Sequence, residues 1–138
     1  MDKKIPWEIY RECTLIAKSY YDLLEQRRDI EKEILLGSNA PADGMPRSPG
    51  VGDPTEQKAE ALIQRKAEVE KKIHALQTAF EHLEEEWERK LIRLNLFREQ
   101  RIPMECLTAH GVNVCVRTMK QKRREFILDV AQLLGMIE

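Results

Sequence analysis

The sequence predicts an all-α protein: a long antiparallel helical hairpin (a coiled coil) followed by a smaller helical C-terminal region. Apolar residues recur at helical steps of three and four over two long segments. A glycine- and proline-rich segment separates these two, and further prolines and glycines divide the last third into short helical pieces. We therefore expect the hairpin over residues 1–97 and the second region over residues 98–138.

The first helix is predicted from Pro6 to Leu36. Proline suits the first turn of a helix, and Gly37 suits the position just after its end. One apolar stripe runs along this segment, formed by Trp7, Tyr10, Cys13, Ile16, Ala17, Tyr20, Leu23, Leu24, Ile30 and Ile34. About 30 residues make a rod of roughly 45 Å.

A break is predicted over residues 37–53, which hold four glycines and three prolines. This segment is either a flexible connection or an ordered loop whose glycines permit positive φ. It is not a phosphate-binding P-loop, because no glycine in it is followed by Lys-Ser or Lys-Thr.

The second helix is predicted to begin at Pro54, with Asp53 as its cap and Glu56 three residues after that cap. It is expected to continue to about Phe97. Its stripe alternates steps of four and three, as in a heptad seam, through Leu62, Lys66, Val69, Ile73, Leu76, Phe80, Leu83 and Trp87. Antiparallel pairing of the two helices would bring Trp7 close to Leu83 and Trp87.

The last third changes character at Ile102-Pro103, which breaks the preceding helix. A short helix is predicted from Pro103 to His110, ended by Gly111, and a turn over residues 112–114. A final helix is predicted from Val116 to Leu134, stopped by Gly135. This order is the layout of a helix-turn-helix, in which residues 83–97 would form the supporting helix.

Positive and negative charges balance over the whole chain, but not within each segment of it. The 23 basic and 24 acidic residues give a net charge of −1, which excludes a generally cationic protein. Residues 113–124 nevertheless carry five basic residues and no acidic one. Because attraction to phosphate depends on the local field, this segment is the candidate for contact with nucleic acid.

Helical phase sorts these basic residues. Arg123 falls on the apolar stripe of the final helix, so we expect it to lie at the core edge or to pair with an acid such as Glu105. The stripe itself consists of Met119, Phe126, Ile127, Val130, Leu133 and Leu134. Early turns of a recognition helix meet base edges, and arginine and glutamine suit bidentate contacts to guanine and adenine. The predicted DNA-binding residues are Arg117, Thr118, Lys120, Gln121, Lys122 and Arg124.

Lys120 and Lys122 flank this face and suit phosphate contacts. The competing interpretation of the whole face is the ordinary solvated side of a basic helix.

No enzyme, cofactor or metal site is predicted. His74 and His82 are eight residues apart with Thr78 between them, so they lack the i+4 spacing of a metal pair. The glutamates at 84–86 and 88 fit a solvated helix face. Cys106 and Cys115 are expected to be small, buried or half-buried side chains.

The sequence predicts a cytoplasmic protein. No apolar run approaches the roughly 20 residues that span a bilayer, and the N-terminal residues lack the apolar core of a signal peptide.

Two short stretches resemble the ArpU/RinA-type phage transcriptional regulators. In the first, Met45-Pro46-Arg47 and then Asp53-Pro54-Thr55 are similar to the loop that joins two long helices in that family. In the second, residues 111–127 (GVNVCVRTMKQKRREFI) are similar to the family's C-terminal reader. The resemblance implies a helical hairpin with a C-terminal helix-turn-helix and regulation of phage or prophage genes in a bacterial host.

We therefore expect a sequence-specific DNA-binding transcriptional regulator whose partner is duplex DNA, with RNA polymerase as a further candidate. A homodimer is expected, because two long helices alone bury only a small core. The alternative is a phage coiled-coil assembly or interaction protein, such as a small terminase-like subunit.

Overall fold

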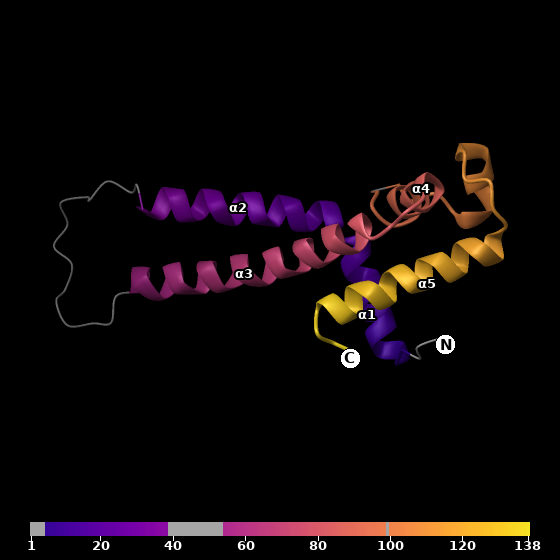
Figure 1. Ribbon diagram of the computed structural model, residues 1–138. Coiled ribbons are helices and arrows are strands. Elements are labelled where there is room, and N and C mark those ends of the chain that lie inside the picture. The colour runs from indigo at the N-terminus through magenta and orange to yellow at the C-terminus, as the bar shows by residue number, and fades with distance from the viewer. Residues whose placement is uncertain (1–4, 39–53, 99) are drawn as a thin grey trace.

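The computed structural model describes residues 5–38, 54–98 and 100–138. Within these residues the chain is helical and has no strand, which confirms the predicted all-α class (Figure 1). Its elements are α1 (Trp7–Lys18), α2 (Tyr20–Ser38), α3 (Pro54–Glu81), α4 (Glu86–Asn95), the 3₁₀ helix η1 (Met104–His110) and α5 (Val116–Leu133). The predicted loop at 37–53 lies outside the described residues, apart from its first two, which end α2.

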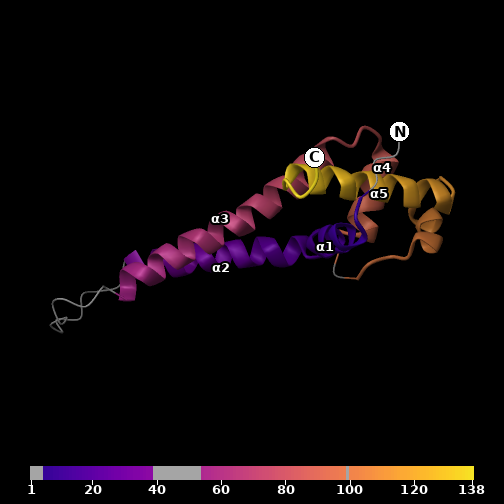
Figure 2. The same cartoon turned by 90° about the horizontal axis from the view of Figure 1, so that it is seen from below.

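Helices α2 and α3 lie side by side and run in opposite directions (Figures 1 and 2). Their apolar stripes face each other: Leu23 and Ile30 of α2 and Val69, Ile73 and Leu76 of α3 are all buried. The two helices project as a rod from a group formed by α1, α4, η1 and α5 (Figure 2). The packing of α2 on α3 therefore uses the apolar stripes that the sequence predicts.

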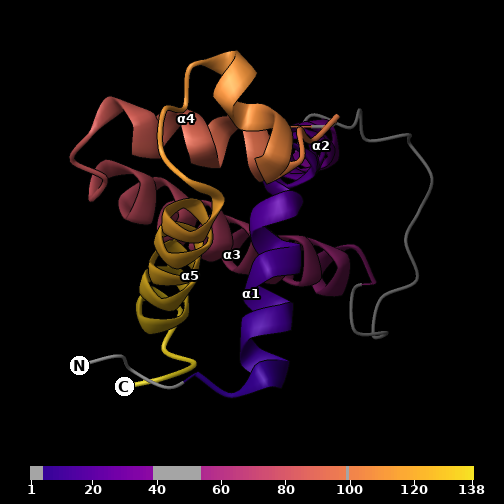
Figure 3. The same ribbon diagram turned by 90° about the vertical axis from the view of Figure 1, so that its right-hand side faces the viewer.

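The predicted single helix over 6–36 is wrong at Ser19, where the chain bends between α1 and α2. The Ser19 hydroxyl donates to the Leu15 carbonyl at 2.8 Å, and its N–H donates to the carbonyls of Leu15 and Ile16. Serine hydroxyls that bond back to the preceding turn often bend helices. α1 therefore leaves the rod and packs against α5 (Figure 3).

The predicted contact of Trp7 with Leu83 and Trp87 is wrong for the same reason. Trp7 is 70% exposed, and its ring stacks on that of Tyr10 of the same helix. α1 thus joins the C-terminal region by packing, although it belongs to the predicted hairpin by sequence. The predicted division of the chain at residue 97 remains a prediction.

The predicted second helix is also interrupted, because α3 ends at Glu81 and α4 begins at Glu86. Leu83 stays buried across this break, so the apolar pattern continues where the helix does not. The Glu88 carboxylate accepts the N–H of Glu84 at 3.2 Å, an arrangement close to a capping box at the start of α4. No glycine or proline marks this break in the sequence.

The C-terminal elements agree closely with their predicted limits. The predicted short helix is the 3₁₀ helix η1, ended by Gly111 at φ 93°, and α5 ends near Gly135 at φ 73°. Met119, Phe126, Ile127 and Val130 of the predicted stripe are buried, with Ala131 in addition. The prediction that Leu133 belongs to this stripe is wrong, because Leu133 is 39% exposed at the end of α5.

An aromatic cluster joins the rod to the C-terminal region. Phe97, which follows α4, lies with its ring centre 4.5 Å from that of Tyr20 on α2 and 5.9 Å from that of Phe80 on α3. It also meets Phe126 of α5 edge-on at 5.7 Å. None of the described helices is long and apolar enough to cross a membrane.

Candidate nucleic-acid interface

The start of α5 is held by the turn that precedes it. Gly111 adopts the left-handed conformation, which lets the chain reverse after η1. The N–H of Val112 then donates to the Leu107 carbonyl at 3.1 Å, and both side chains are fully buried. These contacts fix how α5 leaves η1, so the first turns of α5 have a defined direction relative to the core.

Five of the six predicted DNA-binding residues lie exposed on α5: Arg117, Thr118, Lys120, Gln121 and Arg124. Within residues 5–38, 54–98 and 100–138, no carboxylate pairs with Arg117, Lys120 or Arg124. Met119 between them is buried. The helix therefore presents unneutralised cations on one side while its opposite side packs into the core.

Lys122 differs from the other predicted residues, because it is engaged inside the protein. Its Nζ lies 3.3 Å from Oε1 of Glu88, a side chain that is only 10% exposed, and 3.4 Å from Oε2 of Glu125. Burial opposes the charge of Lys122, but the hydrogen bond and charge of Glu88, aided by Glu125, outweigh it and raise the pKa. This cation is thus largely compensated within the fold.

Arg123 turns inward, as its helical phase predicts, but it meets a different partner from Glu105. Its Nη1 donates to Oδ1 of Asn95 at 2.9 Å, and Nδ2 of Asn95 donates to the Ile102 carbonyl at 3.0 Å. The buried Nε of Arg123 has no hydrogen-bond partner in the described part of the chain. This relay ties α5 to the end of α4 and to the segment before η1.

Asn95 is not among the residues that the sequence predicts to have a role. It is 7% exposed and lies among the buried Leu91, Ile92 and Leu96. A polar side chain within an apolar helical stripe was the available signal, since buried polar groups need partners.

Cys115 precedes α5 and is exposed, as is Cys106, so the expectation that both are buried or half-buried is wrong. Cys115 Sγ lies 3.2 Å from the Thr118 hydroxyl, and this hydrogen bond, with backbone N–H groups of the first turn, lowers the pKa of Cys115. Cys13 is the buried cysteine, and burial, with a smaller effect of Glu12, raises its pKa to about 11.

The histidines make local contacts. His82 Nδ1 lies 2.7 Å from Oδ2 of Asp129, which links the end of α3 to α5, and His74 Nδ1 lies 3.2 Å from the Thr78 hydroxyl. Among the described residues no group of three or more His, Cys, Asp or Glu side chains is placed to hold a metal ion.

The acidic run has two parts. Glu86 is exposed and pairs with Arg89 and Arg93, and these hydrogen bonds lower its pKa. The expectation that all these glutamates lie on a solvated face is wrong at Glu88, which is buried against Lys122.

An open cavity of about 470 Å³ lies where the rod meets the rest of the molecule. It is lined by side chains of α2, α3 and α4 together with Phe97, namely Tyr20, Tyr21, Gln77, Phe80, Glu81, Arg93 and Phe97. Gln77 Nε2 donates to the Tyr20 hydroxyl at 3.1 Å across it, so part of its polar lining is already paired.

Comparisons with known protein families, with characterised proteins and with solved structures returned no match for this chain.

Proposed function

We propose that the chain is a sequence-specific DNA-binding transcriptional regulator of phage or prophage genes, in which α5 enters the major groove of duplex DNA. One observation carries the proposal: the first turns of α5 expose Arg117, Lys120, Gln121 and Arg124 together, without an internal ion-pair partner among the described residues. The η1–Gly111–α5 order supports a helix-turn-helix, in which the second helix reads bases through its N-terminal turns.

The six predicted residues have unequal parts in this proposal. Arg117 and Gln121 are four residues apart on α5 and are the candidates for base contacts. Lys120 and Arg124 supply phosphate contacts, and Thr118 adds a hydroxyl that also bonds to Cys115. Lys122 contributes less, because Glu88 and Glu125 already compensate its charge.

Binding is to be measured by fluorescence anisotropy on duplex DNA that flanks the chain's own gene, at two salt concentrations. We expect affinity to fall steeply with salt, because each phosphate contact releases condensed counterions. Unchanged affinity between the two salt conditions, or no binding at low salt, would refute the proposal.

Substitutions separate base contacts from phosphate contacts. Arg117→Glu and Gln121→Glu should remove most of the preference for the specific site over random DNA, since a good bidentate contact discriminates by about 1–3 kcal/mol. Lys120→Ala should weaken binding to all sequences alike and reduce the salt slope by about 1. Lys58→Ala, an exposed lysine on α3, is the matched control and should leave binding unchanged.

The phage assembly protein is the alternative outcome of the same experiments. A small terminase-like subunit would form a ring of many subunits in solution and would not lose a site preference on changing Arg117 or Gln121.

A further inference from the structure

Three basic side chains from distant parts of the sequence come together where α1 ends. Lys18 is the last residue of α1 and is half-buried. Arg123 belongs to α5, which packs beside α1 (Figure 3), and Arg101 belongs to the segment between α4 and η1. We name Lys18, Arg101 and Arg123 the cationic cluster.

Contacts of Asn95 hold two members of the cationic cluster near each other. Asn95 accepts a hydrogen bond from Nη1 of Arg123 and donates one to the carbonyl of Ile102. The N–H of Ile102 donates in turn to the Leu94 carbonyl at 3.0 Å. Because Ile102 is bonded directly to Arg101, these hydrogen bonds fix the backbone of Arg101 beside the guanidinium of Arg123.

Aromatic packing brings the third member to the same place. Tyr20, two residues after Lys18, stacks on Phe97 with ring centres 4.5 Å apart. Phe97 also meets Phe126, which lies one turn after Arg123 on α5. The end of α1 is thus held against the part of α5 that carries Arg123.

The charge of the cationic cluster is not neutralised by the described part of the chain. None of its members forms an ion pair there, and Arg123 donates only to the neutral amide of Asn95. Burial first, and then the charges of Arg123 and Arg101, lower the pKa of Lys18 below its usual value. The three cations therefore repel one another, at a cost in free energy that a bound anion would remove.

We propose that the cationic cluster binds a small phosphate-bearing anion, which Lys18 and Arg101 contact from the solvent side while Arg123 supplies a fixed charge from within the fold. Arg101 is exposed and Lys18 is half-buried, so the site is open to solvent. The planar fork of arginine fits two phosphate oxygens, and lysine adds a point charge. Three positive charges favour a multivalent phosphate over a carboxylate, which carries a single charge.

Phosphate groups occur both in small free compounds and in the backbone of nucleic acids, and the position of the cluster favours the free compound. Arg123 points about 160° around α5 from Gln121, at 100° per residue. A duplex that lies along Gln121 and Arg117 therefore meets the other side of the helix. The inference does not rest on DNA binding.

The first test is isothermal titration calorimetry of the full chain with pyrophosphate, at an ionic strength kept constant with sodium chloride. We expect one-to-one binding that saturates below about 10 mM pyrophosphate. Constant ionic strength separates this binding from general screening of the cluster by salt. Absence of saturable binding, or a stoichiometry of several anions per chain, would overturn the proposal.

The second test uses variants of the two residues that contact the anion. Lys18→Gln and Arg101→Gln should each weaken pyrophosphate binding by about tenfold, because each removes a charge-assisted hydrogen bond. Lys18→Arg keeps the charge and should restore binding to within about threefold of the wild type. Circular dichroism checks that each variant is folded. Unchanged binding by folded Lys18→Gln would overturn the proposal.

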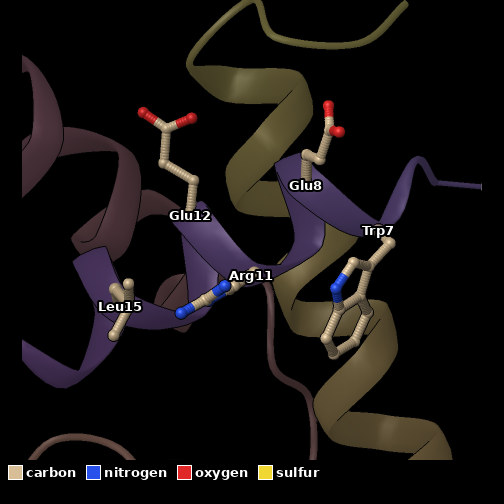
Figure 4. A pocket seen from close by; sticks show the side chains of 5 residues that line it. All are labelled: Trp7, Glu8, Arg11, Glu12 and Leu15. Carbon is tan, nitrogen blue, oxygen red and sulfur yellow. The ribbon is translucent and has the colours of Figure 1, made fainter.

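Arg11→Gln is the matched control for these variants. Arg11 is an exposed cation of the same helix and lies between Trp7 and Leu15 (Figure 4). It is about 10 Å along the helix axis from Lys18, so its loss should weaken pyrophosphate binding by less than about twofold. An effect as large as that of Lys18→Gln would show diffuse attraction instead of a site, and would contradict the proposal.

The last test distinguishes the two sources of phosphate, with duplex DNA in the anisotropy assay. Lys18→Gln should change the affinity for DNA by less than about twofold, although it weakens pyrophosphate binding. A tenfold loss of DNA affinity in a chain that does not bind pyrophosphate would place the cluster in the nucleic-acid interface and overturn the proposal. Binding of pyrophosphate by a chain that binds no DNA would refute the proposed function and support this inference.

Discussion

Lys122 and Arg123 are neighbours in the basic segment, yet both are used inside the protein. Lys122 pairs with the nearly buried Glu88, and Arg123 donates to Asn95. Two of the five basic residues between positions 113 and 124 thus hold α5 against α4. The cations left for an external partner are Arg117, Lys120 and Arg124.

Loss of either member of the Lys122–Glu88 pair should destabilise the fold. We expect Lys122→Met and Glu88→Gln each to lower the free energy of unfolding by about 1–2 kcal/mol, measured by urea denaturation at neutral pH. This loss lies between those expected for an exposed and for a fully buried ion pair, because the Lys122 side chain is 26% exposed while that of Glu88 is only 10% exposed. Arg124→Met, an exposed neighbour, is the control and should change stability by less than about 0.5 kcal/mol.

The same pair sets a pH dependence. Glu88 and Glu125 raise the folded pKa of Lys122 above the ordinary value of 10.5. The stabilisation is therefore complete below pH 10.5 and is lost as pH rises through the raised folded value. The stability difference between the wild type and Lys122→Met should be constant near neutrality and should shrink in strong alkali; a difference that grows with pH would contradict this assignment.

At the scale of elements, the two breaks in the predicted long helices determine which helices pack together. The bend at Ser19 lets α1 pack against α5, and the interruption between Glu81 and Glu86 lets α4 pack against η1 and α5. Neither break carries a glycine or a proline. The turn between η1 and α5, by contrast, depends on Gly111.

Gly111→Ala should lower the free energy of unfolding by about 1 kcal/mol, because φ is 93° and alanine rarely adopts that conformation. An added Cβ would meet Lys90 Nζ at 3.0 Å, a flexible end that can move aside, so the cost is in the backbone. Gly111→Asn should cost less, since asparagine tolerates left-handed conformations. Urea denaturation of both variants measures these free energies of unfolding. A Gly111→Ala variant at least as stable as Gly111→Asn would contradict the prediction.

At the scale of the whole molecule, Phe97 connects the rod to the remaining helices. It is 5% exposed and contacts aromatic rings of α2, α3 and α5. Rod and C-terminal region therefore share one aromatic cluster at their junction, in which Phe97 and Phe126 are buried. We expect them to unfold together rather than as separate units.

Phe97→Ala should reduce the free energy of unfolding by about 3–5 kcal/mol, since it opens a cavity in that cluster. Tyr21→Ala is the control, because Tyr21 is 51% exposed nearby and should cost far less. Circular dichroism reports all helices, and Trp87 fluorescence reports α4 in a Trp7→Phe background. Coincident transitions by both probes are expected for the wild type; separate transitions would show that the rod unfolds independently.

The candidate DNA interface was largely accessible from sequence, because helical phase depends on local geometry alone. Phase placed Met119, Phe126 and Ile127 in the core and Arg117 and Gln121 outside. The role of Lys122 was not accessible in this way. Its partner Glu88 lies 34 residues earlier in the sequence and reaches it only through the packing of α4 on α5.

The sequence by itself determined the all-α class, the α2–α3 pairing stripe and the limits of the C-terminal helices, since periodicity, proline and glycine act through local backbone geometry. Only the tertiary structure decided where the long helices break and which partner each piece takes. At Ser19 and after Glu81 the local preference for continuing a helix is weak, and burying α1 and α4 against α5 outweighs a turn of helix. The exposure of Trp7 is a consequence of that choice, because α1 left the hairpin that was predicted to cover this side chain.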